Sequence, residues 1–199
     1  SRNGLQDRFR RDFREEAHGV QTYRAAAVCP VKSVGMASQQ PRQHVVTIVV
    51  NPRSGRGRAA RLLPQVTRAM GEALPDSEIK VLQTRSYGDA RARTLAAVAQ
   101  SLPPEPGRRP DVLVTMGGDG MASLGMNACA GSHVQLGVIP AGTGDDFARG
   151  VGIPRDPLRA ATAIALGLTR RIDLTLARGE IAGGLQQRYI GSVVSSGYD

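Results

Sequence analysis

A carboxylate enclosed by glycines, Asp119 within the run GGDG at residues 117–120, is the first candidate for chemistry in this sequence. The run directly follows residues 111–116 (DVLVTM), an apolar, β-branched stretch that is typical of a strand buried on both faces. Glycines let the backbone leave such a strand in conformations closed to other residues and approach a ligand closely. Open α/β sheets bind ligands at the carboxyl ends of their strands. The alternative is a glycine turn with a solvated Asp119. Other loops that reach the same edge of the sheet would favour a ligand site over this alternative.

Two further glycine loops follow predicted strands. The apolar run HVVTIVV at residues 44–50 leads into NPRSG, and the run at residues 135–139 leads into PAGTGDD. In a parallel sheet with right-handed crossovers, the loops after the strands all emerge at one edge. Exposed backbone N–H groups, helix N-termini and the hydroxyls of Ser54, Thr84 and Thr143 would together suit a polyphosphate. Neither GxxxxGK[ST] nor GxGxxG occurs, so these loops are neither a Walker loop nor a Rossmann fingerprint.

Alternating strands and helices would position these loops. We predict strands at residues 44–50, 78–82, 111–116 and 135–139, and helices at 58–74, 89–102, 121–130, 147–150 and 156–166. Pro64 is interpreted as marking the first turn of its helix, Asp89 and Asp156 as N-caps, and Pro157 as a first helical residue. The segments 171–176 and 187–194 alternate like strands, with Gly183-Gly184 as a hairpin turn.

The order of these elements predicts an α/β fold. Strand–helix units followed by a hairpin indicate a doubly wound, mostly parallel nucleotide-binding lobe and the start of a β-rich second lobe, which the chain ends too soon to complete. We therefore divide it into residues 1–43, 44–168 and 169–199. The first segment is charged and lacks apolar periodicity, and is interpreted as an extension of unassigned function: a disordered segment, a solvated helix or a membrane-surface patch.

The composition favours anionic partners. Lys and Arg number 26 against 17 Asp and Glu, which gives a net charge of +9 and a sequence pI near 10.7. Such a charge suits nucleotide phosphates, acidic membrane surfaces or nucleic acid. Nucleic acid is the minor interpretation, because almost all the basic charge is Arg and no basic–aromatic interleaving appears. The hydrophobic fraction of 41% with only 4% aromatic residues predicts an aliphatic α/β core.

Signals for targeting and metal binding are missing from the sequence. No stretch of about 18 apolar residues occurs, and the first residues lack the apolar segment of a signal peptide. Cys29 and Cys129 match neither a metal spacing nor CxxC, so we interpret them as ordinary thiols of a reducing compartment. His18, His44 and His133 are scattered and interpreted as surface or loop residues. We expect a cytoplasmic protein, with peripheral contact to the inner face of the membrane left open, and find no mark of an oligomeric state.

Four motifs, in order, carry a resemblance to a known family. NPRSG, LQTRSYGDA, GGDGM and IPAGTGDDFAR resemble the catalytic domain of the diacylglycerol kinase and sphingosine kinase family, in its bacterial lipid kinase branch. The resemblance runs from about residue 44 to residue 199 and includes the closing YIGSVVSSGYD. It implies an ATP-dependent enzyme that, with Mg²⁺, phosphorylates a lipid hydroxyl at the membrane surface. Diacylglycerol would be converted to phosphatidic acid in phospholipid biosynthesis.

The resemblance also implies site residues. The expected nucleotide contacts are Asn51, Pro52, Arg53, Ser54, Gly55, Thr84, Gly117, Gly118, Asp119, Gly120, Met121, Ala122, Ser123, Gly142, Thr143 and Gly144. Asn51 suits adenine or ribose recognition or bracing of its own loop. Asp119 is the expected catalytic residue, acting through Mg²⁺ or as a proton acceptor. Asp146 would help to hold the metal through water, although Asp145 and Asp146 equally suit N-caps of the helix at 147–150.

Three positions depart from the family pattern. Met121 stands where a Thr is usual, Asp145 where an Asn is usual, and Leu124 where a Glu is common. The usual general base of the family lies in the second lobe, which this chain does not complete. Two alternatives therefore stay open. One is an NAD kinase, whose family shares a GGDG loop, and the other is a regulator that binds nucleotide without chemistry.

Overall fold

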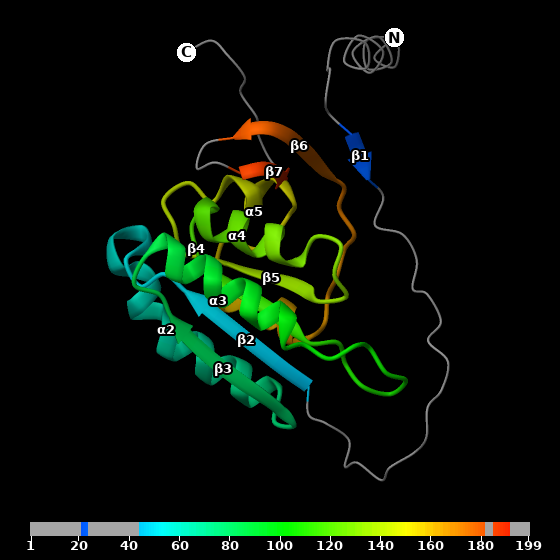
Figure 1. Ribbon diagram of the computed structural model, residues 1–199. Helices are drawn as coiled ribbons and strands as arrows, with labels where there is room; N and C mark the ends of the chain where they lie inside the picture. Colours follow the sequence, from blue (N-terminus) through cyan, green and yellow to red (C-terminus); the bar gives the residue numbers. More distant parts are fainter. Residues whose placement is uncertain (1–20, 24–43, 182–184, 192–199) are drawn as a thin grey trace, which may run out of the picture.

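The computed structural model describes residues 21–23, 44–181 and 185–191 of the chain. At its centre is a sheet of four parallel strands in the order β3-β2-β4-β5 (Figure 1). The strands are β2 (His44–Val50), β3 (Ser77–Gln83), β4 (Val112–Gly117) and β5 (Gln135–Pro140). Every residue of β4 is buried, as a central strand covered on both faces requires. The predicted parallel α/β framework is confirmed.

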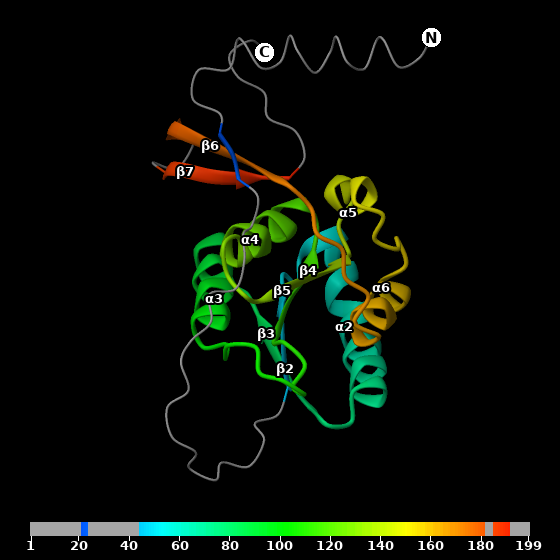
Figure 2. The ribbon, with the colours of Figure 1, turned by 90° about the vertical axis from the view of Figure 1, so that its right-hand side faces the viewer.

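Helices cover both faces of the sheet, as Figure 2 shows from the side. On one face lie α2 (Ser54–Ala73) and α6 (Pro157–Ala165), and on the other α3 (Tyr87–Ala99) and α4 (Asp119–Cys129). The alternation of β2 divides its side chains between two cores. Ile48 packs with Val66 and Met70 of α2, whereas Val49 packs with Leu124 of α4. Each of these buried aliphatic side chains contributes about 1.5–3 kcal/mol to folding.

The strand order contains one topological switch point. From β2 the chain first adds β3 on one side and then crosses to add β4 on the other. The carboxyl ends of β2 and β4 lie level, because Val50 pairs in register with Met116. Ligands of open α/β sheets bind outside the carboxyl ends at such a point. The NPRSG loop follows β2 and the GGDG loop follows β4, so both leave the sheet there.

A second, smaller sheet lies over α4 (Figures 1 and 2). It has the order β1-β6-β7, with β6 (Leu174–Ile181) and β7 (Leu185–Ile190) antiparallel. The predicted hairpin is thus present, while its expected turn at Gly183-Gly184 lies outside the described residues. Strand β1 (Gln21–Tyr23) pairs antiparallel with β6, so three residues of the segment that we set aside as an extension belong to this sheet.

Two local predictions were wrong. Pro64 lies inside α2 and does not mark its first turn. The helix is instead interrupted at its start, where residues 55–57 have left-handed backbone angles. The N-cap of α3 is Ser86, whose Oγ accepts a hydrogen bond from the Asp89 N–H at 3.1 Å, while Asp89 lies in the first turn. The predicted cap of α6 is confirmed, since Asp156 accepts from the Arg159 N–H at 2.8 Å.

Cys129 ends α4 with a free, partly buried thiol. Burial raises the pKa of this thiol to about 12. The thiol therefore stays protonated at physiological pH and is a poor nucleophile, which agrees with its interpretation as an ordinary cysteine. Cys29 lies outside the described residues. Within the described part of the chain, no helix has the length and apolar character needed to cross a bilayer.

His44 is buried, contrary to its interpretation as a surface residue, and only 7% of its surface is exposed. Its Nδ1 lies 2.9 Å from Ser77 Oγ, and its Nε2 has no hydrogen-bond partner within the described residues. Burial lowers the pKa of the imidazole, the guanidinium groups of Arg109 and Arg108 add to this, and the Asp111 carboxylate opposes it. The folded protein therefore holds His44 in its neutral form.

We predict that this histidine makes folding sensitive to mild acid. Because the pKa of His44 is lower in the folded state than its ordinary value of 6.5, its stability contribution is complete above that value and declines as the pH falls below it. The His44→Gln variant keeps a polar partner for Ser77 and cannot titrate. Urea unfolding at pH 7.5 and 5.5 should show a larger loss of unfolding free energy in the wild type than in the variant. Parallel losses in both proteins would contradict the assignment.

Candidate nucleotide site

The loops at the carboxyl edge of the sheet start level with one another, because the backbone pairing continues beyond the strands. The Asn51 N–H donates to the Met116 carbonyl at 3.1 Å, and the Ala141 N–H donates to the Gly117 carbonyl at 2.9 Å. On the other side of β2, the Thr84 N–H donates to the Val50 carbonyl at 2.9 Å. The loops NPRSG, QTRS, GGDG and PAGTGDD therefore leave from one edge.

Glycines bring three of these loops into backbone contact. A Cβ on Gly142 would lie 2.5 Å from the Gly118 Cα, and a Cβ on Gly55 would collide with the Ala141 carbonyl oxygen. Both obstacles are backbone atoms, which cannot rotate away as a side chain can. The PAGTGDD loop thus touches GGDG on one side and NPRSG on the other. The predicted convergence of the loops is a feature of the structure.

The NPRSG loop is held in an unusual conformation. Gly55, Arg56 and Gly57 have φ angles of 57°, 55° and 85°. A left-handed conformation costs a residue such as Arg56 roughly 1–2 kcal/mol, and backbone strain of this kind persists only where surrounding structure enforces it. The Asn51 Oδ1 accepts from the Arg53 N–H at 3.0 Å, so Asn51 braces its own loop, one of the two roles expected for it.

Asp119 joins two loops and is not freely solvated. It lies in the first turn of α4, where its Oδ1 accepts from the Phe147 N–H at 2.9 Å. Phe147 belongs to α5 (Asp146–Gly150), so the carboxylate caps a helix that begins 27 residues later in the chain. The second oxygen, Oδ2, faces Gly144, where an added Cβ would lie 3.3 Å from it. This oxygen borders the exposed part of the PAGTGDD loop.

The neighbouring carboxylates differ from each other. The Asp145 Oδ1 accepts from the Gly142 N–H at 3.0 Å, and the residue has a left-handed φ of 55°. Burial raises the pKa of Asp145, the Gly142 N–H opposes this, and the Asp119 charge raises it further. Asp146 is exposed and forms an ion pair with Arg149 at 3.0 Å. Asp145 occupies the N-cap position of α5, as the alternative expected, but neither Asp145 nor Asp146 makes a capping bond with its side chain, and the Asp119 carboxylate makes that bond instead.

A cavity of about 590 Å³ adjoins the NPRSG loop at the ends of β2 and β3. It is lined by Pro52, Arg53, Gln83, Thr84, Arg85 and Arg93. The Thr84 hydroxyl is buried and donates to the Val50 carbonyl at 3.1 Å. Guanidinium groups bind phosphates well, so the lining suits an anionic ligand. Sequence reasoning missed Gln83, Arg85 and Arg93, although the first two lie within the LQTRSYGDA motif.

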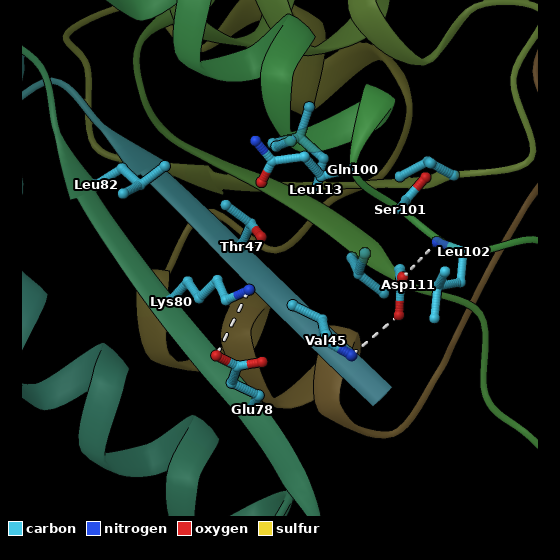
Figure 3. Close-up of a pocket in the computed structure, with 13 residues that line it drawn as sticks. Val45, Thr47, Glu78, Lys80, Leu82, Gln100, Ser101, Leu102, Asp111 and Leu113 are labelled. Carbon is cyan, nitrogen blue, oxygen red and sulfur yellow. Dashed lines mark hydrogen bonds and ion pairs between the residues drawn. The ribbon is translucent and has the colours of Figure 1, made fainter. Parts of the chain in front are cut away.

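A different cavity, of about 480 Å³, lies at the opposite end of the sheet (Figure 3). Its lining includes the exposed ion pair of Lys80 with Glu78, and the side chain of Asp111. Asp111 accepts hydrogen bonds from the Val45 and Leu102 N–H groups, each at 3.0 Å, and its role is to join β2 to the segment before β4. This cavity contains none of the residues that we predicted for the site.

The remaining predicted residues lie in three different environments. Met121 and Ala122 are buried under the loops, and Met121 packs with Val49 and Leu113 in the core that also contains Leu124. Ser123 faces the small sheet, where its Oγ accepts from Arg188 at 2.9 Å. Other predicted residues lie at the edge and are exposed to solvent: Arg53, Gly120, Thr143 and Gly144.

The carboxylates at this edge fit a Mg²⁺ ion that arrives with phosphates. Within the described residues, no three His, Cys, Asp or Glu side chains cluster tightly enough to hold a metal by themselves. Mg²⁺ in phosphate-transfer sites needs only one or two carboxylates, because phosphates and water supply the other ligands. Asp119 and Asp145 are close enough that the charge of one raises the pKa of the other. That repulsion favours a cation between them.

We predict that Gly142 cannot accept a side chain. In Gly142→Ala the new Cβ must displace the Gly118 backbone, so we expect a loss of about 1–3 kcal/mol in unfolding free energy. Gly120→Ala is the matched control from the facing loop, because a Cβ on Gly120 meets nothing within 4 Å. It should leave stability unchanged or raise it. Thermal unfolding of both variants measures the difference, and equal stability would show that the loops do not touch.

Asp145 should be a site where removing a charge stabilises the protein. Since the pKa of Asp145 is raised in the folded state, its ionised form costs stability at neutral pH, and the cost disappears as the pH falls through that pKa. Asn accepts from Gly142 equally well and tolerates a left-handed φ. Asp145→Asn should unfold at a higher temperature at pH 7 and lose this advantage near pH 3. The control is Asp146→Asn, and a gain independent of pH would refute the explanation.

Comparison with known proteins agrees with the fold. Residues 45–177 match the family profile of the diacylglycerol kinase catalytic domain. The chain is 33% identical over 168 residues to a diacylglycerol kinase of Mycobacterium tuberculosis, covering 82% of this chain and 50% of that protein. It is 38% identical over 144 residues to a diacylglycerol kinase of Bacillus subtilis, covering 69% of this chain and 44% of that protein.

A solved structure shows the same relationship. The crystal structure of a diacylglycerol kinase from Bacillus anthracis strain Sterne superposes with a TM-score of 0.54 and 25% sequence identity, covering 68% of this chain and 43% of that one. The chain spans about half the length of the curated relatives that it matches. With the profile matching most of its residues and four motifs meeting at one edge, the chain belongs to the diacylglycerol kinase catalytic domain family.

Proposed function

We propose that this chain is the nucleotide-binding lobe of a lipid kinase. The kinase transfers the γ-phosphate of ATP to a lipid hydroxyl, with diacylglycerol as the acceptor and phosphatidic acid as the product. The observation that carries the proposal is the backbone contact of Gly118 with Gly142 at the carboxyl edge of the sheet, beside the Asp119 carboxylate, which bonds the first turn of α5. This edge is where an open α/β sheet binds a phosphorylated ligand.

The triphosphate would lie along the glycine loops. The exposed backbone at Thr143 and Gly144 and the N-terminus of α4 favour negative charge there. The cavity next to NPRSG contributes Arg53 and Arg85, and its buried Thr84 is held in place by β2. This cavity would take the part of the nucleotide that extends away from the transferred phosphate. Backbone groups would therefore bind the phosphates, and side chains would bind the rest of the nucleotide.

Asp119 would act at the transferred phosphate. Its Oδ1 is occupied by the Phe147 N–H, which leaves Oδ2 toward the exposed Gly144. Mg²⁺, bound with ATP, would neutralise charge on the phosphate oxygens, with Asp119 and Asp145 as its protein ligands. Asp146 is a further candidate ligand, because its Oδ2 lies beside Gly144 as the Asp119 Oδ2 does, while its Oδ1 pairs with Arg149. Asp119 and Asp145 would also fix the loop on which the phosphates lie.

The lipid would be presented from the membrane surface. The net charge of +9 favours approach to an anionic bilayer from the cytoplasm. The acceptor hydroxyl and the general base would come from the side of the small sheet, where β6 and β7 begin the second lobe. In this arrangement, the nucleotide edge and the second lobe face each other across α4.

A nucleotide-binding regulator is the second candidate. It is favoured by Met121 and Leu124, which are both buried and apolar and so offer neither a hydroxyl nor a carboxylate to a nucleotide. The two candidates differ in chemistry and share the same site. A transfer assay distinguishes them.

The decisive experiment uses the full-length protein with labelled ATP, Mg²⁺ and mixed micelles that contain diacylglycerol or another lipid alcohol. We expect label in phosphatidic acid. Asp119→Asn should lower kcat by about 100-fold or more. Its amide oxygen can still accept from Phe147, so the fold should persist. Asp76→Asn, an exposed change in the turn before β3, is the matched control and should retain wild-type activity.

Two outcomes would overturn the kinase proposal, and a third would overturn the role of Asp119. A folded protein that binds Mg-ATP but labels none of the lipids would favour the regulator. Labelling of NAD in place of lipid would identify an NAD kinase. Asp119→Asn with wild-type activity would remove Asp119 from the chemistry.

A further inference from the structure

The outer edge of β7 is paired with a side chain instead of a strand. In the order β1-β6-β7, one edge of β7 bonds to β6 and the other has no neighbouring strand among the described residues. At this edge the Tyr189 N–H donates to the Asn127 Oδ1 at 2.9 Å, and the Asn127 Nδ2 donates to the Tyr189 carbonyl at 2.9 Å. A residue of an adjacent strand makes the same reciprocal pair of bonds. The Asn127 amide therefore substitutes for a strand.

The orientation of this amide is fixed from within α4. The Asn127 Nδ2 also donates to the Ser123 carbonyl at 2.9 Å, one helical turn earlier. Both protons of the amide nitrogen are thus used, one for the helix and one for β7. Ser123 adds a further bond to the same strand by accepting from Arg188. Since residues four apart lie on one face of a helix, Ser123 and Asn127 form a single contact surface for β7.

The helix that carries this contact also carries Asp119. Asn127 lies eight residues after Asp119, which is about 12 Å along a continuous α-helix. Asp119 in turn caps α5 through Phe147. Gly191, directly after β7, packs against both α4 and α5. A Cβ on Gly191 would lie 2.7 Å from Met126 Sδ and 2.9 Å from Phe147 Cε2. Strand β7 therefore contacts α4 through Asn127, α4 contacts α5 through the Asp119 carboxylate, and α5 contacts the end of β7 through Phe147.

We propose that Asn127 is a positioning residue for phosphate transfer: its amide locks β7 to α4 and so sets the second lobe relative to Asp119. This inference rests on the proposed kinase function. The nucleotide loops lie at the sheet edge and do not contact β7 through these bonds, so ATP binding should not depend on them. Transfer does depend on them, because the reacting atoms must be held about 3–3.5 Å apart and in line.

The test is Asn127→Ala in the full-length protein, with Gln65→Ala as the control. Gln65 is an exposed amide on α2, so its truncation removes a similar group far from β7. We expect Asn127→Ala to lower kcat by about tenfold while KM for ATP stays within about twofold, since loss of oriented binding affects the transition state alone. Mg-ATP binding measured by calorimetry should match the wild type.

A second measurement does not depend on activity. Hydrogen exchange of the Tyr189 amide should accelerate by about tenfold or more in Asn127→Ala, because the variant removes the acceptor of that N–H. Exchange in β2 and β4 should be unchanged. If Asn127→Ala fails to fold, Asn127→Gln is the milder variant, because it keeps the amide donor and acceptor and moves them by one methylene relative to Tyr189. It should show the same split between kcat and KM in smaller measure.

These results separate the two proposals. A wild type that is inert toward lipids would refute the kinase and with it the catalytic consequence of the lock, while the exchange of Tyr189 would still decide whether Asn127 holds β7. An active wild type whose Asn127→Ala variant keeps its kcat, or changes only KM for ATP, would overturn the positioning role. Unchanged protection of Tyr189 would show that the bonds do not hold the strand.

Discussion

The contact between the Gly118 and Gly142 backbones is the constraint on which the site depends. Two loops that follow different strands approach so closely that an added methyl group would overlap the opposing main chain. This approach is possible because β4 and β5 are neighbours in register and because both loops lack side chains where they meet. The parallel sheet brings the loops to one edge, and glycine brings them together. Every other feature of the site is arranged around that contact.

The same contact explains why one carboxylate has two tasks. Once the PAGTGDD loop lies against GGDG, the N-terminus of α5 falls within reach of Asp119, and a helix start in that place needs an acceptor. Asp145, the residue next to α5, is turned back toward Gly142 and does not supply it. Asp119 is therefore a structural cap as well as the carboxylate that we propose for the chemistry. A change at this position alters the loop as well as the chemistry, and thermal unfolding must accompany any loss of activity.

Local patterns in the sequence predicted the framework well. Residues 44–50 and 111–116 are apolar and rich in β-branched side chains. This composition favours a strand that is buried on both faces. Glycine loops after successive strands predicted a common edge, because right-handed crossovers permit little else. The cap of α6 was predicted correctly because Asp156 is a favoured N-cap residue and Pro157 is a favoured first helical residue, so both indicate the same helix start. At α3 the Ser86 side chain accepts from the Asp89 N–H, and the Asp89 carboxylate reaches back to the Arg85 N–H, so the two residues share the start of the helix with Ser86 as its N-cap.

Features that depend on distant residues could not be predicted. The bond from Phe147 to Asp119 joins two separate motifs, and the pairing of Asn127 with Tyr189 spans 62 residues. Neither interaction produces a recognisable pattern in the nearby sequence. Pro64 was misjudged because proline is rare within helices, yet α2 retains it among strongly packed neighbours such as Leu63 and Val66. The pairing of β1 with β6 was missed for a related reason, since three residues in a charged segment carry too little pattern to indicate a strand.

The thiol of Cys129 offers a way to observe α4 directly. Its protonated, partly buried state makes it slow toward alkylating reagents while the helix is packed. A fluctuation that lifts the end of α4 from the core would hydrate the sulfur, restore an ordinary acidity and open it to modification. The rate of labelling at this single sulfur therefore reports how often the helix that joins Asp119 to the small sheet comes loose. Cys129 is therefore a natural probe of local opening at the end of the helix that carries both Asp119 and the contacts to β7.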